Sequence, residues 1–334
     1  MKRFDCIRIE IIIRVAVLYH KRDPMQAILR HILFPAPYPP FPISDSDKDK
    51  VFWLPNNTNS SPVPCILFSP EGPAKYFFIW CHGNGGDMGS MSYTVKTISH
   101  ELKAHALMFE YPAYGLLSGS RVAPSQESIN DHAERAYLFV RDTLKWPTDR
   151  IILYGHSIGS GPACHLASRE PVGALILQSP YTSIRKLIEN KVHWVPDWMN
   201  IPFWNNEETM ERVTCPVLFM HGQRDRLVPS EQSQTLHDGL KHEKRKLEWS
   251  PDDDHNSISD SFISQKVKDF LDHYFKDPTE PLPDVRIDSQ WRETPPNVQS
   301  GGSFPLLPFL INASVNLSRG ASRVSGSRRP DDQQ

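Results

Sequence analysis

The sequence predicts an α/β domain built on a mainly parallel central sheet with helices on both faces. Short, nearly all-apolar runs recur between about residues 51 and 276, and stretches of helical length separate them. Such runs are typical of strands that are buried on both faces, as in parallel sheets. Strands that alternate with helices are joined by right-handed crossovers, and these crossovers place helices on both faces of the sheet.

The expected elements follow one another through this central region. The apolar runs predict strands at 77–81, 106–111, 151–154, 174–178 and 217–221, and a further strand at 245–250. Helices are expected at 125–145, 157–168, 229–240 and 258–275. In the first of these helices, apolar residues recur at the spacing of one helix face.

Both ends of the chain differ in composition from the centre. Residues 1–33 are expected to form an amino-terminal extension, either a short amphipathic surface segment or a docked or frayed one. Its Ile- and Val-rich part is interrupted by charges and is too short to span a bilayer. The α/β domain is expected over 34–276. Residues 277–334 are rich in Pro, Ser, Gly and Arg, which predicts a tail without fixed structure.

Composition and charge exclude several classes of protein. The formal net charge of −2 over 334 residues gives no general attraction to nucleic acid, so no nucleic-acid partner is expected. The five cysteines are scattered and lack the spacing of a zinc site or a disulfide framework. We therefore expect no metal, free thiols and a reducing compartment, the cytoplasm.

The most informative motif lies at residues 155–159, Gly-His-Ser-Ile-Gly, between an apolar strand and a helical stretch. A serine on a sharp strand-to-helix turn has a strained backbone and needs small neighbours. The turn raises the hydroxyl above the sheet and aims the Ile158 amide at a reacting carbonyl. Ser157 is therefore the predicted nucleophile. A glycine turn that matches the pattern by chance is the competing interpretation.

The nucleophile needs a base, and in folds with this turn the chain order is serine, acid, histidine. Asp225 follows the expected strand 217–221 and is the predicted acid, which would orient the base. His255 follows the strand 245–250 and is the predicted base. Three alternatives stay open. Asp225 is a solvated loop residue, Asp253 or Asp254 is the acid in its place, or His255 has no catalytic role.

A glycine-rich turn, residues 82–86 (His-Gly-Asn-Gly-Gly), ends the strand 77–81. The second amide of an oxyanion hole is expected from the loop after an early strand. We expect the Asn84 amide to act there beside the Ile158 amide, with Gly85 as the next choice. A plain glycine turn is the alternative. Nucleotide-binding patterns are missing from the sequence of this turn, so no cofactor is expected.

Together, these motifs resemble the alpha/beta-hydrolase domain-containing protein 17 family. The matching segments stand in the family's order at 82–84, 110–119, 152–159, 179–183 and 216–225, and the similarity covers about 34–275. The resemblance implies an α/β-hydrolase fold with Ser157, Asp225 and His255 as its catalytic triad. It also implies a membrane-associated serine hydrolase that removes palmitoyl groups from protein cysteines. Close relatives within this branch of hydrolases share the motifs.

Members of that family carry a cluster of amino-terminal cysteines that become palmitoylated, whereas here only Cys6 lies in that region. One acyl chain gives marginal membrane binding, and stable anchoring takes two signals. The resemblance implies Cys6 as the lipidation site, and with this single acyl chain only a weak, peripheral contact with the cytoplasmic face of a membrane is expected.

The segment between residues 179 and 215 is too short for a large lid, so a minimal lid is expected. An open site suits a bulky substrate, either an acylated protein or a lipid. Trp194, Trp198 and Trp204 are candidates to line an acyl-binding groove, because such pockets are mostly apolar. Ordinary packing of these rings against the sheet is the alternative.

The sequence thus predicts a serine hydrolase of long-chain acyl thioesters or esters, foremost a protein depalmitoylase. A lipid esterase or monoacylglycerol-type lipase with the same triad is the first alternative. The second is a non-catalytic binding protein on the same fold, since fold alone does not fix function.

Overall fold

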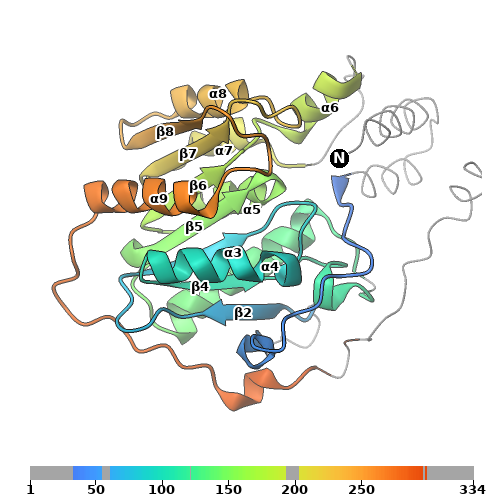
Figure 1. The fold of residues 1–334 in the computed structure, drawn as a ribbon, viewed down its shortest axis with the longest axis vertical. Helices are drawn as coiled ribbons and strands as arrows, with labels where there is room; N and C mark the ends of the chain where they lie inside the picture. Colours follow the sequence, from blue (N-terminus) through green and yellow to red (C-terminus); the bar gives the residue numbers. More distant parts are fainter. Residues whose placement is uncertain (1–32, 55–60, 121, 193–202, 296–297, 299–334) are drawn as a thin grey trace, which may run out of the picture.

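The computed structural model describes residues 33–54, 61–120, 122–192, 203–295 and 298, and we discuss only these (Figure 1). Its strands are β1 (Val51–Trp53), β2 (Pro64–Phe68), β3 (Tyr76–Cys81), β4 (Ala104–Phe109), β5 (Ile151–His156), β6 (Ala174–Gln178), β7 (Val217–Gly222) and β8 (Arg245–Ser250). Its described helices are α3 (Met88–Glu101), α4 (Gln126–Leu138), α5 (Ser160–Ala167), α6 (Ile184–Val192), α7 (Asn206–Met210), α8 (Glu231–Gly239) and α9 (Asp260–Tyr274).

The strands form one sheet in the order β1-β2-β4-β3-β5-β6-β7-β8. Strands β3 to β8 pair in parallel, whereas β2 is antiparallel to both of its neighbours, β1 and β4. The predicted fold class, a mainly parallel sheet with helices on both faces, is confirmed. Because β4 to β8 are parallel to β3, the loops at their carboxyl ends meet along one edge of the sheet.

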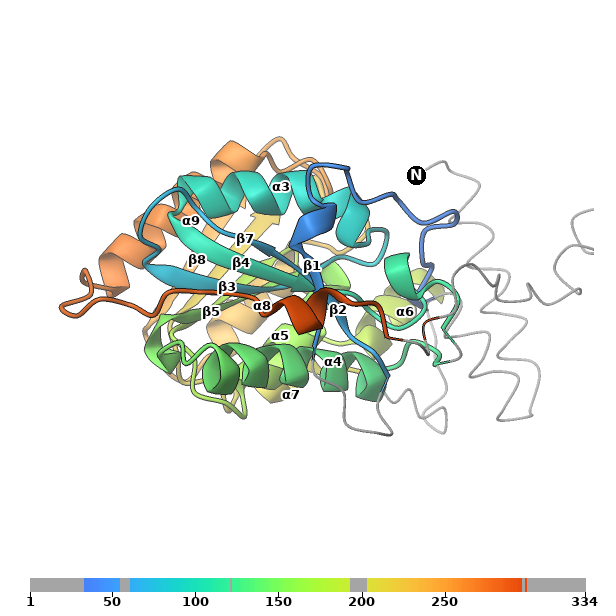
Figure 2. The ribbon, with the colours of Figure 1, turned by 90° about the horizontal axis from the view of Figure 1, so that it is seen from below.

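Figure 2 shows the sheet between two layers of helices. Helices α3 and α9 cover one face, and α4, α5, α7 and α8 cover the other. In β3 the side chains alternate accordingly: Phe78 and Trp80 pack with the first layer, and Phe77 and Ile79 with the second. This burial on both faces explains why the central strands appear in the sequence as continuous apolar runs.

The sequence-based expectations missed several elements. Strands β1 and β2 are short and antiparallel, and β2 begins at Pro64, a residue that cannot donate to a sheet ladder. Helix α3 has many Ser, Thr and Gly residues, but Asp87 and Ser90 form a capping box that fixes its start. The helix expected at 125–145 is interrupted: α4 ends at Leu138 and one wide turn follows over Phe139–Thr143.

The C-terminal strap, residues 277–295, leaves α9 and runs in extended form to the β1 side of the sheet (Figure 1). Within it, Trp291 packs edge-on against Phe139 at 5.1 Å between ring centroids, and three aliphatic side chains also contact the core: Leu282, Val285 and Ile287. The prediction of a tail without fixed structure is therefore wrong for 277–295, because apolar side chains spaced along this Pro-rich stretch find partners in the core. Residues 299–334 lie outside the described part.

At the other end, Phe34 is buried in the core, and the start of the domain at residue 34 stays a prediction. Residues 1–32, including Cys6, lie outside the described part, and lipidation of Cys6 stays a prediction. None of the helices in the described ranges is long and apolar enough to cross a membrane.

Candidate active site

Ser157 lies at the turn between β5 and α5, with a backbone φ of +53°. This left-handed conformation is costly for a residue with a side chain. The glycines on either side permit it. A Cβ atom on Gly155 would lie 2.6 Å from the Gly159 carbonyl oxygen, and one on Gly159 would lie 2.2 Å from the Cys81 carbonyl oxygen. This strand-to-helix turn at residues 155–159, which we call the elbow, is therefore in close contact with the end of β3.

Ser157, His255 and Asp225 form one hydrogen-bonded line. The Ser157 hydroxyl donates to His255 Nε2 at 2.8 Å, and His255 Nδ1–H donates to Asp225 Oδ2 at 2.6 Å. All three are buried, with 9%, 6% and 7% of their surface exposed, respectively. They come from the ends of β5, β8 and β7, which the parallel sheet brings to one edge. The structure thus brings together the three residues that chain order suggested.

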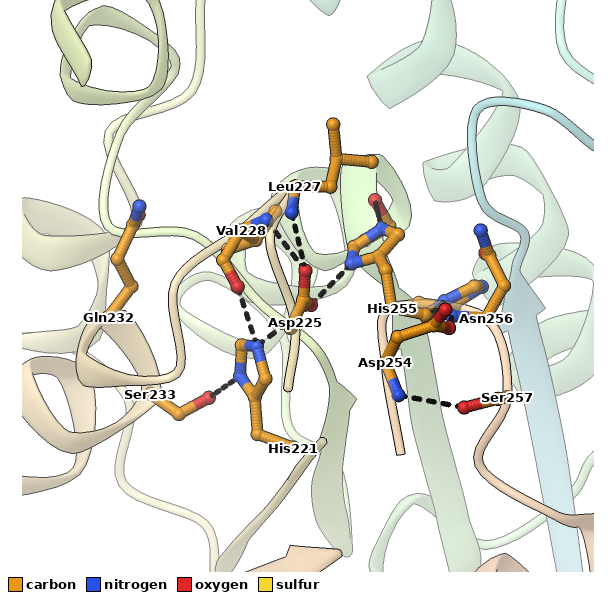
Figure 3. Close-up of polar contacts among 12 residues, drawn as sticks. His221, Asp225, Leu227, Val228, Gln232, Ser233, Asp254, His255, Asn256 and Ser257 are labelled. Atoms are coloured by element: carbon orange, nitrogen blue, oxygen red, sulfur yellow. Dashed lines mark hydrogen bonds and ion pairs between the residues drawn. The ribbon is translucent and has the colours of Figure 1, made fainter. Parts of the chain in front are cut away.

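The Asp225 carboxylate accepts four hydrogen bonds, two on each oxygen (Figure 3). Oδ1 accepts from the backbone amides of Leu227 and Val228, at 2.8 and 2.9 Å. Oδ2 accepts from His255 and from His221. Burial raises the pKa of Asp225, but the hydrogen bonds from the two histidines and the amides outweigh it and hold this pKa well below its ordinary value. The group is therefore a carboxylate at neutral pH.

His221, at the end of β7, was missed from the sequence. It is fully buried, and its Nε2–H lies 3.0 Å from Asp225 Oδ2 and 2.9 Å from the Val228 carbonyl oxygen. Its Nδ1 accepts from the Ser233 hydroxyl at 2.6 Å. The signal was a polar ring at the end of an apolar strand, four residues before the acid. Figure 3 shows Asp225 between the two imidazoles.

The loop before His255 is shaped by its own carboxylates. The Ser257 hydroxyl donates to Asp253 Oδ1 at 2.9 Å and accepts from the Asp254 amide at 2.7 Å. These contacts lie within the loop, and the imidazole is bonded to Asp225 instead. The alternative in which Asp253 or Asp254 supplies the acid is therefore not the arrangement in the structure.

The glycine-rich turn after β3 lies beside the elbow, because a Cβ on Gly83 would come within 2.7 Å of His156 Nδ1. Burial, followed by the neighbouring His255, lowers the pKa of His156 to about 3, so its ring is neutral. Gly85 is exposed, and the Asn84 side chain is bonded on both of its polar atoms. The structure thus brings the turn and the elbow together. The oxyanion roles of Asn84, Gly85 and Ile158 stay predictions.

Of the three candidate groove residues, Trp194 and Trp198 lie outside the described residues. Trp204 is buried, and its indole N–H donates to Asn130 Oδ1 at 2.9 Å. A Cβ on Gly161 would meet the Trp204 ring at 2.4 Å. This placement against α5 favours the packing alternative for Trp204.

The described ranges contain no group of His, Cys, Asp and Glu side chains arranged to hold a metal ion. The cysteines in these ranges are free and buried: Cys65, Cys81, Cys164 and Cys215. Burial raises the pKa of each thiol, so none of them is a thiolate nucleophile near neutral pH.

Comparisons with known proteins agree with this architecture. A family model described as an alpha/beta hydrolase domain matches residues 74–276, more than half of the chain. The chain therefore belongs to the alpha/beta hydrolase family, and the coarse prediction of a hydrolase is supported.

Two curated relatives are similar in sequence to this chain. The chain is 26% identical over 213 residues to alpha/beta hydrolase domain-containing protein aho-3 of Caenorhabditis elegans, covering 63% of this chain and 61% of that protein. It is 26% identical over 219 residues to human alpha/beta hydrolase domain-containing protein 17B, covering 64% and 73%. The expected resemblance to the protein 17 family is confirmed. The match spans less than two thirds of the nematode protein's length.

Solved structures with the same fold include an esterase of Pyrococcus furiosus, with a TM-score of 0.57 and 18% identity over 70% of this chain and 98% of that one. Est1E of Butyrivibrio proteoclasticus has a TM-score of 0.53 and 20% identity over 67% and 98%. At these identities the likeness concerns the fold.

Proposed function

We propose that this protein is a serine hydrolase that cleaves long-chain acyl thioesters or esters, and foremost removes palmitoyl groups from cysteines of other proteins. The observation that carries the proposal is the line of hydrogen bonds from Ser157 through His255 to Asp225, at a strained strand-to-helix turn. Nucleophile, base and orienting acid in this order are the parts that acyl transfer requires.

In the acylation step, Ser157 Oγ bonds to the acyl carbon while its proton passes to His255 Nε2. The charge on the carbonyl oxygen is stabilised by backbone amides, which we assign to Ile158 and Asn84. The bond from carbon to sulfur or oxygen then breaks, and the proton on Nε2 passes to the leaving thiolate or alkoxide. Asp225 stabilises the imidazolium that exists between these events.

In the deacylation step, His255 Nε2 takes a proton from water, and the hydroxide oxygen bonds to the acyl carbon. The bond between this carbon and Ser157 Oγ breaks, and Nε2 returns the proton to Oγ. A fatty acid leaves and the enzyme is regenerated. Each atom in this cycle comes from the substrate, water or the three side chains.

Two observations support the choice of substrate. The chain is similar to human alpha/beta hydrolase domain-containing protein 17B. The sequence motifs resemble the same family, and that resemblance implies removal of palmitoyl groups from protein cysteines. The segment between β6 and β7 is short, which suits a bulky acylated protein. The same proposal holds that the enzyme acts on proteins at the cytoplasmic face of a membrane, which it contacts peripherally.

The test compares three substrates with wild type and Ser157→Ala: a palmitoyl-thioester peptide, a medium-chain ester and a monoacylglycerol. We expect the highest kcat/KM for the thioester, and a loss of about 10³-fold or more in the alanine variant. Ser168→Ala, which removes a half-buried hydroxyl at the far end of α5, is the matched control and should keep full activity. A fluorophosphonate probe should label wild type and the control only.

The other outcomes assign the protein differently. A preference for monoacylglycerol would move it to the lipid esterases with the same triad. If no substrate is turned over in a Ser157-dependent way and the probe does not react, the protein is a binding protein on a hydrolase fold.

A further inference from the structure

Residues 110–115 (Glu-Tyr-Pro-Ala-Tyr-Gly) follow β4, and we call them the clamp segment. They lie next to the oxyanion loop, residues 82–88, because β3 and β4 are parallel neighbours and their carboxyl ends share one edge. The mechanism above uses no side chain of the clamp segment. Its backbone turns sharply, with φ of +65° at Ala113 and +39° at Gly115.

The clamp segment contacts the beginning of the oxyanion loop through Tyr111. The Tyr111 hydroxyl donates to the His82 carbonyl oxygen at 2.8 Å. The two rings also stack, with centroids 3.8 Å apart and an angle of 25° between their planes. Both side chains are buried, so water does not compete for these contacts.

Tyr114 contacts the middle of the loop. Its buried hydroxyl donates to Asn84 Oδ1 at 2.7 Å. The Asn84 Nδ2 group donates in turn to the Leu33 carbonyl oxygen. The side chain of the residue whose amide we assign to the oxyanion hole is thus fixed from two directions.

Glu110 contacts both ends of the loop. Its Oε2 accepts from the Met88 amide, the first of α3, at 3.1 Å, and its Oε1 lies 3.2 Å from His82 Nε2, without hydrogen-bond geometry. The Glu110 carbonyl accepts from His132 Nδ1–H at 2.8 Å. Glycine is needed at 115, since a Cβ there would lie 1.9 Å from Oε2.

We infer that Glu110, Tyr111 and Tyr114 are positioning residues that hold the oxyanion loop, and with it the Asn84 amide, in the geometry needed for the transition state. The inference rests on the proposed function, because it assumes that this amide stabilises the oxyanion. A donor at the wrong place loses most of its effect, since the charge appears only in the transition state. Weakening the hold should therefore lower kcat more than it changes KM.

The experiment uses Tyr111→Phe and Tyr114→Phe in the full chain, each of which removes one hydroxyl. Tyr137→Phe is the matched control, because its buried hydroxyl also donates to a backbone carbonyl, that of Pro171 at 2.7 Å. Pro171 precedes the amino end of β6, whereas the site lies at the carboxyl ends of the strands. We expect kcat for the preferred ester or thioester to fall about tenfold in both clamp variants, with KM within about twofold of wild type. The control should keep both values.

Hydrogen–deuterium exchange of the amides at 82–88 gives a second reading that does not depend on turnover. We expect faster exchange there in both clamp variants than in wild type or Tyr137→Phe, at a temperature where all four proteins are folded. Unchanged exchange and unchanged kcat would overturn the inference. Faster exchange with unchanged kcat would overturn its catalytic part.

The failure of the proposed function is a separate result. If the wild type has no Ser157-dependent turnover, the hydrolase proposal fails, and the exchange data alone decide whether the clamp segment holds the loop.

Discussion

At the scale of single residues, Asp225 accepts three hydrogen bonds besides the one from the base, His255. Two amides and two imidazoles surround the Asp225 carboxylate, and His221 is itself fixed by Ser233 and the Val228 carbonyl. A carboxylate held on all sides keeps one orientation, and the imidazole that it orients keeps one tautomer. His221, which the sequence did not indicate, thus helps to orient the Ser157–His255–Asp225 triad, which it did indicate.

We expect His221→Phe to lower kcat by about tenfold with little change in KM, far less than the ~10⁴-fold that loss of a triad acid can cost. Phenylalanine keeps the ring volume but removes the hydrogen bonds to Asp225 Oδ2 and to Ser233. Steady-state kinetics over a range of pH would measure this. His221→Gln restores an N–H donor and should recover part of the loss. Wild-type kcat in His221→Phe would contradict the positioning role.

Asp225→Asn should lower the rate of fluorophosphonate labelling by about 10³-fold or more. The amide would favour the wrong imidazole tautomer and would place N–H groups against donors. In the wild type, the pKa of Asp225 is depressed in the fold. The Asp225 carboxylate therefore stabilises the protein above its unfolded pKa of about 3.9, and this contribution is lost only as the pH falls below that value. The acidic limb of the activity should therefore not arise from Asp225. Asp238→Asn, at an exposed carboxylate of α8, serves as the control.

At the scale of elements, the elbow is a close contact of β5, α5 and β3. Gly159→Ala would place a methyl group 2.2 Å from the Cys81 carbonyl oxygen, and the backbone must shift to relieve it. We expect this variant to lose at least about 2 kcal/mol of unfolding free energy and most of its activity. Gly239→Ala is the matched control at the end of α8, where an added Cβ meets nothing within 4 Å. Urea unfolding curves would compare the two, and equal midpoints would contradict the account of the elbow.

The sequence could predict the parts of this edge that follow local rules. Ser157 was identified from its glycine neighbours, and Asp225 and His255 from their places after successive strands. Contacts that depend on which strands are neighbours could not be predicted this way. The bond between Tyr111 and His82 crosses 29 positions of sequence and exists because β4 lies beside β3. The antiparallel strands β1 and β2 were missed for a related reason, since their pairing is set by the sheet rather than by their own short sequences.

At the scale of the whole molecule, buried neutral histidines predict sensitivity to acid. Burial lowers the pKa of His132 to about 4, against an unfolded value of about 6.5. The unfolded chain takes up this proton first, so the stabilisation is complete above pH 6.5 and is lost as the pH falls toward 4. At about 1.4 kcal/mol per pH unit, His132 alone contributes up to about 3 kcal/mol to this loss.

We therefore expect His132→Asn to flatten the decline of unfolding free energy between pH 6.5 and 4. Asparagine keeps an N–H donor for the Glu110 carbonyl but does not titrate. His100→Asn, at an exposed position of α3, should leave the slope as in wild type. Urea titrations at several pH values would measure both slopes. The same slope in all three proteins would contradict the prediction.

The C-terminal strap predicts a further effect on stability. Ending the chain after Lys276 removes four apolar side chains from the core, including Trp291 with its contact to Phe139. We expect Tm to fall by roughly 5 °C or more, because each kcal/mol shifts the Tm of a domain of this size by about 2–4 °C. A chain that ends after residue 298 keeps the strap and is the control. Trp291→Ala in the full chain should give part of the effect, and an unchanged Tm in the short chain would contradict it.

The hydrogen bond from Asn84 to Leu33 has a practical consequence. It connects the backbone at Leu33, where the described part of the chain begins, to one side chain of the oxyanion loop. A bulky protein or solid support attached just before Leu33 would therefore stand at the mouth of the reacting centre and would screen it from large acylated proteins, while a small ester could still diffuse in. For assays with protein substrates, a purification handle is thus better not attached just before Leu33.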